Sequence, residues 1–576
     1  MRPLSACIAC RDRRKRCDRP RRGTSCTFCT RRGFHCTVEQ KPAATPASAD
    51  GYERLASAPR HGAHPISSAA LMPDRDLCNE LVDLYFRYIH VTFHNLFHRP
   101  SFEACVRDGS IPKVLLFGLF GLSSRFSSHP SFADVDPKER GRAYAKEAER
   151  LLDLHKTCLT TIQACVLLGA IQVVEMDSAT ESIFYTIACR MAMILDLPNA
   201  PAKTRIEQEV NLRVWWSVVA TDTWSSTALG LPRAVQPRYD IPMPMDERVF
   251  LRLTPAEPPD PPQQGLDARS RPGSDLSTSL IAQMIKLNSI LYEINTFNTK
   301  AVSGVLETPR AHESSVAELS ATLDAWRSEL PADMEYTADN LQYWAGHDCG
   351  TSFVVLHLNF HHAGQLLFYS FLHSSLTSDS QHHPSSSSWS SPTTSTNISS
   401  SSGSSSSAHY AARCQYHAAC LCEIMYSACG QEEQDANLAN NTNTNNSAVN
   451  SGAIQVRHPL AGHMLVVAST VHMYALLFGT DDAEIALARA RLEHNFRIIS
   501  RLQGYWPSLH ASFSRLSAFH TACLGRGGGS GGAGGGDGTF RLDRWMLRFL
   551  LDFAKPVDVA ERDREREGGG WGAGVM

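Results

Sequence analysis

Apolar residues recur along most of the chain with the period of an α-helix. Between Asp76 and Tyr88 they lie at i, i+4, i+7, i+8 and i+11 from Leu77, which places them on one stripe of a helix. Similar patterns predict helices over 112–123, 138–156, 160–175, 179–196 and 206–229. Alternating strand patterns are almost absent, so we expect a mainly α protein.

The second half continues the helical pattern. One stripe joins Leu280, Ile281, Met284, Leu287, Leu291 and Ile294. Residues 353–372 are apolar nearly all round, so this helix must be buried. The apolar run 460–478 is interrupted by His463 and His472 and predicts another buried helix, so we expect no membrane span. A last helix is expected over 540–554.

Segments of low complexity separate these helices. They are rich in Pro and Ala, in Ser, in Asn or in Gly, and cannot bury enough apolar surface to become ordered. We therefore expect an N-terminal domain (1–40), a flexible linker (41–75), a helical domain (76–372), a Ser-rich disordered insert (373–409), a C-terminal helical part (410–555) with disordered inserts at 436–451 and 527–538, and a disordered tail (556–576).

Charge is distributed unevenly over the 576 residues. The formal net charge is −3, but the first 36 residues contain eleven Lys and Arg against two Asp, a balance of +9, which leaves −12 for the remainder. Only the N-terminus is therefore suited to a polyanion.

The same N-terminal stretch contains six cysteines in two copies of the spacing C-x2-C-x6-C: Cys7, Cys10, Cys17, Cys26, Cys29 and Cys36. Thiolates at this density select zinc or an iron–sulfur cluster. Two tetrahedral zinc ions need eight ligand positions, which six thiolates fill only if two of them bridge both metals.

Three alternatives compete with a binuclear zinc site. A disulfide framework needs an oxidising compartment, and the sequence shows no secretory signal. One four-cysteine zinc site with two spare thiols leaves the repeated spacing unexplained. An iron–sulfur cluster does not account for the surrounding positive charge. Spacing and charge together favour two zinc ions.

These six cysteines, the basic run Arg11, Arg13, Arg14, Lys15, Arg16 and the Cys17-Asp18 step followed by Pro20 resemble the DNA-binding domain of the fungal Zn2Cys6 binuclear-cluster transcription factors. The resemblance implies that Cys7 and Cys26 bridge two zinc ions, that Cys10 and Cys17 complete one ion, and that Cys29 and Cys36 complete the other. It also implies that CGG-type triplets are read from Arg13 and Arg14, where many relatives carry lysine.

The physical chemistry of this segment is consistent with that resemblance. Thirty residues cannot bury a sufficient core, so metal binding must supply most of the fold. The stretch Arg11–Arg16 forms a short basic helix in our interpretation, able to contact guanine edges in the major groove. A group of further arginines is expected to meet phosphates: Arg19, Arg21, Arg22, Arg31 and Arg32. A charge run is more often a solvated surface, but here it sits on a metal-stapled loop. The same run can also serve as a nuclear import signal, which predicts a nuclear protein.

Parts of the helical region, from about 76 to 245, resemble the regulatory domain of the same family. The resemblance is carried by FHNLFHRPSF (93–102), TTIQACVLLGA (160–170), IACRMAMILDLP (187–198) and RVWWSVVATDTWSSTALGLPRAV (213–235). Further along, YWPSLHASFSRLSAFH (505–520) resembles another helical element common toward the end of the family's regulatory region, which implies a helix there. Relatives often have a basic residue after Asp222, whereas this chain has Thr223. Three tryptophans, Trp215, Trp216 and Trp224, are expected to pack between helices rather than to form a ligand box.

Other groups of chemically active residues have simpler interpretations. Cys414, Cys420, Cys422 and Cys429 are expected to be buried thiols rather than a second metal site. His357, His361 and His362 on an apolar helix are expected to be core histidines rather than ligands. His347-Asp348-Cys349 combines hydrolase residue types in a row, whereas catalytic triads are assembled in space. The sequence therefore predicts a protein that is not an enzyme.

Two functional hypotheses follow. The first is a zinc-dependent, sequence-specific DNA-binding transcription factor acting on RNA polymerase II genes. Prolines after the cluster exclude a coiled coil there, so a homodimer must form through the helical domain, unless the protein binds as a monomer with a partner's help. Clefts between helices are the expected site for a small-molecule effector or a coregulator. The second hypothesis is a nuclear protein-interaction or corepressor protein whose cluster binds DNA non-specifically.

Overall fold

The computed structural model describes two units, Met1–Ser67 and Ser68–Met576. The described residues are Cys26, Thr30, 71–90, Thr92, 94–236, Arg238, 241–260, 279–303, 309–376, 404–429, Ile454, 456–479 and 481–527. In the first unit, the backbone N–H and the hydroxyl of Thr30 both donate to the carbonyl of Cys26, at 3.0 and 3.1 Å. This i to i+4 bond is one helical turn across the second half of the cysteine motif.

The second unit is helical, and within the described ranges it contains no sheet, only one isolated bridge between His90 and His94. The first helices are α4 (Arg75–Tyr88), α5 (Arg99–Arg107), α6 (Lys113–Ser123), α7 (Arg142–Leu151), α8 (Leu159–Glu175), α9 (Ser178–Ile194), α10 (Arg205–Leu229) and α11 (Glu247–Phe250). The later ones are α12 (Leu280–Ser303), α13 (Pro309–Ser328), α14 (Ala338–Ala345), α15 (Gly350–Phe368), α16 (Ser404–Cys429), α18 (Pro459–Phe478), α19 (Asp482–Gln503) and α20 (Leu509–Gly527). Short 3-10 turns join several of them, the longest being η5 (Tyr369–Leu376).

Local sequence explains where the long helix α10 begins and ends. The Thr204 side chain accepts a hydrogen bond from the N–H of Glu207 at 3.2 Å and so caps the first turn. At the other end Gly230 has φ +66°, a left-handed conformation that favours glycine and closes the helix. The helix is buried on most of its surface and packs against α9 and α12.

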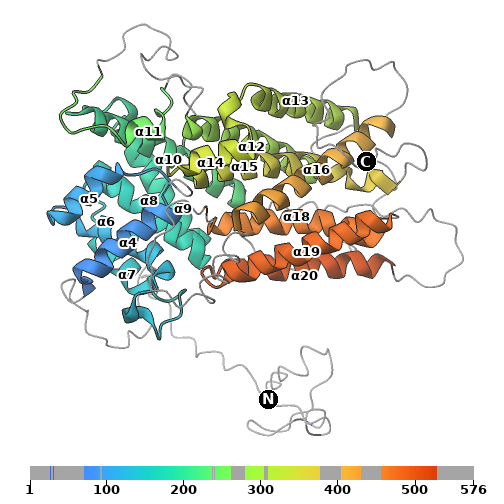
Figure 1. Cartoon of the computed structure of the whole chain (residues 1–576), viewed down its shortest axis with the longest axis horizontal. Helices are drawn as coiled ribbons and strands as arrows, with labels where there is room; N and C mark the ends of the chain where they lie inside the picture. Colours follow the sequence, from blue (N-terminus) through green and yellow to red (C-terminus); the bar gives the residue numbers. More distant parts are fainter. Residues whose placement is uncertain are drawn as a thin grey trace, which may run out of the picture. The chain divides into compact units, whose positions relative to one another are not determined.

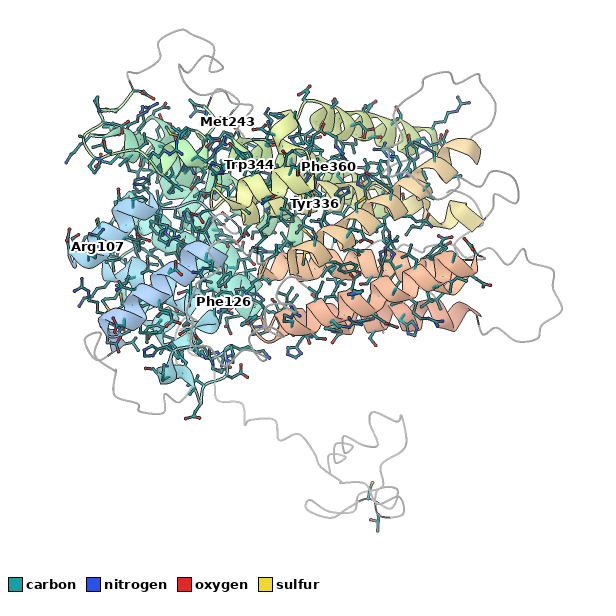
Figure 2. All side chains as sticks on the ribbon, in the orientation of Figure 1. Arg107, Phe126, Met243, Tyr336, Trp344 and Phe360 are labelled. Atoms are coloured by element: carbon teal, nitrogen blue, oxygen red, sulfur yellow. The ribbon has the colours of Figure 1, made fainter. Side chains whose placement is uncertain are left out.

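The C-terminal half is a bundle of long helices. α15 packs against α12, α14 and α16, and α18, α19 and α20 lie side by side (Figure 1). Aromatic side chains gather around α15, among them Tyr336, Trp344 and Phe360 (Figure 2). The ring of Phe353 lies 5.8 Å from that of Tyr336 and 6.3 Å from that of Trp344, so this face of α15 is fully covered.

α18 is long and apolar enough to span a membrane by length and composition alone. However, 83% of its most apolar window is buried inside the helical unit. Its apolar residues therefore pack as core, as the sequence predicted for 460–478.

The beginning and the end of the helical unit are joined through Arg125. Its side chain is 1% exposed and donates to the carbonyl of Tyr505 at 3.1 Å, and its guanidinium lies 4.4 Å from the ring centroid of Trp506. The Trp506 indole in turn donates to the carbonyl of Arg457 at 2.6 Å. Burial lowers the pKa of Arg125 to about 10, which leaves it charged at neutral pH.

The helical expectation is confirmed, with differences in extent. The predicted helix 138–156 is shorter, Arg142–Leu151, because the Arg140 side chain closes the preceding turn on three backbone carbonyls and Leu152 is extended. The expected Ser-rich insert (373–409) was drawn too long at both ends, because η5 continues to Leu376 and α16 already begins at Ser404. Helices α5, α11, α13, α14 and α19 were not predicted individually, and the expected helix 540–554 lies outside the described residues.

Candidate functional site

Most of the predicted metal and DNA-contacting residues lie outside the described part of the chain. Of the six cysteines, only Cys26 is described, and it is fully buried. The other five cysteines and all ten basic residues assigned to DNA lie outside the described residues, so their roles stay predictions. These cysteines are Cys7, Cys10, Cys17, Cys29 and Cys36, and the basic residues lie between Arg11 and Arg32. Within the described residues no three His, Cys, Asp or Glu side chains gather in a way that could hold a metal. The donor set itself, six thiols in a repeated spacing, fits two zinc ions.

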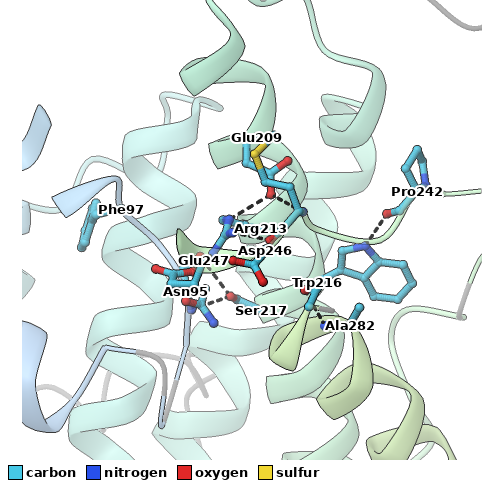
Figure 3. A network of polar contacts seen from close by, with 12 residues as sticks. Asn95, Phe97, Glu209, Arg213, Trp216, Ser217, Pro242, Asp246, Glu247 and Ala282 are labelled. Carbon is cyan, nitrogen blue, oxygen red and sulfur yellow. Dashed lines mark hydrogen bonds and ion pairs between the residues drawn. The ribbon is translucent and has the colours of Figure 1, made fainter. Parts of the chain in front are cut away.

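A buried ion-pair network lies where α10 meets the short helix α11 (Figure 3). Arg213, 2% exposed, donates from Nε to Glu209 at 2.9 Å, from Nη1 to Glu247 and from Nη2 to the carbonyl of Met245 at 2.7 Å. Its guanidinium also lies 3.9 Å from the centroid of the Phe250 ring. Burial acts to lower the pKa of Arg213, but the two glutamates outweigh it and raise that pKa. The arginine is therefore held charged in the interior.

Two further α10 side chains hold the segment that follows the helix. Asp222 accepts hydrogen bonds from the backbone N–H groups of Ala234 and Val235, at 3.1 and 2.9 Å. The Trp216 indole donates to the carbonyl of Pro242 at 2.9 Å (Figure 3). The carboxylate of Asp222 thus binds backbone amides of the segment that follows α10.

A cavity of about 640 Å³ adjoins this network. Its walls come from the loop after α4 and from α9, α10, α12, α15, α18 and α20. A volume of this size is typical of small-molecule sites, which are mostly apolar with a few placed polar groups. The lining includes Trp216 and Trp224 together with Ile281, Met284 and Leu358. Trp215 and Trp216 are buried as predicted, and Trp216 and Trp224 also line the cavity.

The titratable groups lining the cavity are mostly neutral. Burial lowers the pKa of His94 and of His458 to about 3, and lowers that of His463 well below its ordinary value. Burial raises the pKa of Glu181 to about 7. The one permanent charge among these groups, Arg213, is already paired with two glutamates.

Outside the cavity, the expected core histidines are confirmed, whereas of the described thiols Cys414 and Cys422 are buried and Cys420 is only half-buried. His357 bonds the carbonyl of Met334 at 2.9 Å, and His361 bonds His417 between their Nδ1 atoms at 3.1 Å. Burial raises the pKa of Cys422 to about 12, so it stays a thiol. The side chain of Cys429 lies outside the described residues. Cys349 of the His-Asp-Cys triplet is also buried with its pKa raised to about 12, which makes it a poor nucleophile.

Comparison with known proteins agrees with this organisation. Residues 5–45 match the fungal Zn(2)-Cys(6) binuclear cluster domain, and residues 82–328 match the fungal specific transcription factor domain. An uncharacterized transcriptional regulatory protein of Schizosaccharomyces pombe is 25% identical over 52% of this chain and 33% of its own length. The Zn(2)-C6 fungal-type transcription factor FTF1c of Fusarium oxysporum is 22% identical over 76% of this chain and 45% of its own length. A second uncharacterized regulatory protein of S. pombe is 23% identical over 79% of this chain and 54% of its own.

The chain thus spans between a third and about half the length of these curated relatives. It belongs to the fungal Zn(2)-Cys(6) transcription factors, with the binuclear cluster domain followed by the fungal specific transcription factor domain. The cluster domain implies two zinc ions, and neither domain belongs to a family of enzymes.

Proposed function

We propose that this protein is a nuclear, zinc-dependent regulator of RNA polymerase II transcription that recognises CGG-type triplets in the DNA major groove. The observation that carries the proposal is the basic run 11–16, set between the second and third cysteines of a two-zinc motif. When bound, zinc supplies the fold of this segment. Arg13 and Arg14 then contact guanine edges, and Arg19, Arg21, Arg22, Arg31 and Arg32 contact phosphates.

Selection of bound sites from a random pool of duplexes tests the sequence preference. Enrichment of CGG-type triplets by the zinc-loaded full chain supports the proposal. Equal affinity for all duplexes contradicts it and favours the second hypothesis, a protein-interaction or corepressor role.

A matched pair of substitutions separates base contacts from phosphate contacts. Arg14→Ala should flatten the preference for the selected site, by about 1–3 kcal/mol per lost guanine contact. Arg31→Ala should weaken binding to all duplexes about equally. The assignment of these two roles is wrong if both variants change the affinities in the same way across sequences.

The zinc count tests the bridging ligands. Cys7→Ser or Cys26→Ser should remove both zinc ions, because each of these thiolates is proposed to bind both metals. Cys105→Ser, a half-buried thiol on α5, is the matched control and should leave the zinc content unchanged. A zinc content that falls by half in Cys7→Ser, measured by mass spectrometry under native conditions, contradicts the bridging role.

One cluster reads only a few base pairs, too few to select a unique genomic site. The proposed function therefore includes a homodimer formed through the helical domain, or a partner that binds beside the monomer. Sedimentation of the full chain with a duplex carrying two selected triplets, over a range of spacings, distinguishes these assemblies.

A further inference from the structure

Glu181 on α9 is an acidic side chain that the helical unit encloses without a counter-charge. It is 7% exposed and lines the cavity between α9, α10, α12, α15, α18 and α20. It forms no ion pair with any residue in the described part of the chain, and the polar group that acts on it is the hydroxyl of Ser225, which lines the same cavity. Arg213 in the same wall is paired with Glu209 and Glu247 instead. Burial makes ionisation of an unpaired carboxyl group unfavourable and raises the pKa of Glu181 to about 7.

The helical period turns this carboxyl group toward the cavity and away from solvent. The solvent-exposed positions along this part of α9 are Ala179, Ile183, Thr186 and Arg190, and Glu181 lies on the opposite side of the helix. Ser178 and Tyr185, one turn before and one turn after it, also line the cavity. Unlike Oε2 of Glu209, which is buried without a hydrogen bond, both carboxyl oxygens of Glu181 keep accessible surface. Because Glu181 faces inward, this surface opens into the cavity.

The other ionisable groups of the wall leave Glu181 as its unpaired acid. They are Tyr185, Arg213, His94, His458, His463 and the exposed His510, and within the described residues α12 and α15 add none to the lining. Burial lowers the pKa of His94 and His458 to about 3 and that of His463 well below its ordinary value, and it raises the pKa of Tyr185, so these four are neutral at physiological pH. The described wall therefore contains no unpaired permanent cation that could attract an anion.

Aromatic side chains stand beside this acid. Trp216, Ala220 and Trp224 follow one another at intervals of four along α10, so they share one face of the helix, and all three line the cavity. Ser225, whose hydroxyl acts on Glu181, is the residue after Trp224. The faces of indole rings attract cations and pack against apolar groups. A carboxylate next to aromatic rings in an enclosed space suits an organic ammonium ion, because the carboxylate accepts its N–H groups and the rings cover its apolar part.

We propose that this cavity binds a small organic ammonium ion with an aromatic or other apolar body, that Glu181 forms an ion pair with its N–H groups, and that Trp216 and Trp224 contact its apolar body. Binding at this site does not depend on DNA recognition. That such a molecule acts as an effector of transcription does rest on the proposed function. The tests below are made in the absence of DNA, so failure of this proposal is distinguishable from failure of the proposed function.

Three naphthalene probes with one ring system and different substituents test the chemistry. 2-(Aminomethyl)naphthalene is a cation, 2-(hydroxymethyl)naphthalene is its neutral counterpart of similar size, and 2-naphthoate is an anion. Titration calorimetry of the zinc-loaded full chain at about pH 8 should show the ammonium ion binding about tenfold more tightly than the alcohol, and the naphthoate most weakly. Equal binding of ammonium ion and alcohol, tighter binding of the naphthoate, or no binding of the ammonium ion overturns the proposal.

The pH dependence of binding tests the role of Glu181 in the unaltered chain. Its pKa is about 7, so the carboxyl group is mostly ionised at about pH 8 and mostly protonated at about pH 5.5, whereas the probe stays a cation at both values. Lowering the pH over this range should therefore nearly abolish the tenfold preference for the ammonium ion. The alcohol, titrated at the same pH values, corrects for other groups in the wall, His510 included. A preference that does not change with pH contradicts the ion pair.

Substitution of the acid locates the ion pair. Glu181→Gln keeps the shape of the side chain without its charge and should abolish both the preference for the ammonium ion and its pH dependence. Glu175→Gln is the matched control, because this glutamate at the end of α8 is also partly buried but pairs with Arg142 and lies outside the cavity lining. The preference should persist in this control. A preference that survives in Glu181→Gln overturns the role of that residue.

A substitution on another wall tests the place of the apolar body. Ala220→Phe puts a ring between Trp216 and Trp224 and should weaken binding of the ammonium ion at least about tenfold. Thermal denaturation of each variant identifies those that remain folded. Unchanged binding by folded Ala220→Phe excludes this cavity as the site, and the pH profile of the unaltered chain still decides the role of Glu181 if a variant fails to fold.

Discussion

Ionisable side chains are buried in two regions of the helical unit, and the two regions treat them in opposite ways. At the start of α10, Arg213 is kept charged by Glu209 and Glu247. Along α15, α16 and α18, six buried histidines are kept neutral instead: His357, His361, His362, His417, His463 and His472. Burial is the largest cause of their lowered pKa values, and no acid lies among those causes to oppose it.

The difference shows that burial alone does not decide whether a group is ionised. An arginine has no accessible neutral form, so its charge must be stabilised in the interior, by carboxylates at Arg213 and by carbonyl oxygens and an aromatic ring at Arg125. A histidine can lose its proton at small cost, so it packs like an aromatic residue with one or two hydrogen bonds. Charge at α10 therefore specifies which partners must meet, whereas the histidines mainly fill space.

The largest expected effect follows from removing the charged centre. Arg213→Met should lower the free energy of unfolding by about 3–5 kcal/mol, because it leaves Glu209 and Glu247 buried without a counter-charge. Adding Glu209→Gln and Glu247→Gln should recover part of that loss. Denaturant unfolding monitored by circular dichroism measures both steps; a loss below about 1 kcal/mol in Arg213→Met would falsify the account of this network.

The packing of the histidine region is tested at Gly364 on α15. A Cβ at this position would lie 2.5 Å from three ring carbons of His417, which is buried and cannot move aside. Gly364→Ala should therefore cost about 1–3 kcal/mol of unfolding free energy. Gly346→Ala, whose Cβ would meet only backbone oxygens at 3.5 Å, is the matched control and should be nearly neutral.

Acid stability tests the neutral state of the histidines. Burial lowers the pKa of His362 to about 3, so the unfolded chain takes up a proton below the ordinary value of 6.5 before the folded chain does. This contribution to stability is complete above pH 6.5 and is lost as the pH falls below it. When the pH falls from 7.5 to 5.5, the free energy of unfolding of His362→Leu should decrease by about 1 kcal/mol less than that of the parent chain. Identical losses in both proteins would contradict a neutral buried imidazole, and between pH 7.5 and 8.5 the two should not diverge.

The smallest effect on stability is expected at the surface, where ionisable side chains are neither paired in the interior nor neutralised by burial. Arg87 forms an i, i+4 ion pair with Asp83 on α4 at 2.7 Å, and its side chain is 46% exposed. Solvent screens this pair, so Arg87→Ala should change the unfolding free energy by about 0.5 kcal/mol or less. A change above about 1 kcal/mol would mean that exposure does not separate this pair from the buried network.

Local patterns in the sequence predicted the helices well. The stripe from Leu77 to Tyr88 became the buried face of α4, and the apolar 353–372 became the covered helix α15 with η5. The borders of 138–156 and of the Ser-rich insert were less accurate. The start of the first helix depends on the Arg140 side chain, which bonds carbonyls 5 to 13 residues earlier, and the spacing of apolar residues does not encode such contacts.

The cavity could not be predicted in the same way. Its lining residues Asn95, Asn288 and Asn359 come from three segments that lie far apart in the sequence, and each alone is an ordinary polar residue beside an apolar stripe. Only the packing of the helices reveals that these residues line one space. The cysteine motif differs from the cavity in this respect, because the spacing of the cysteines within 7–36 was enough to predict a metal site.

The contact of Arg125 with Tyr505 and Trp506 has a consequence for genetics. A premature stop codon before Tyr505 would delete more than a terminal segment, because it would strip a buried guanidinium near the beginning of the unit of its carbonyl and its aromatic cover. Such alleles should behave as complete nulls of the regulatory region, and late nonsense mutations would be as severe as early ones up to that codon.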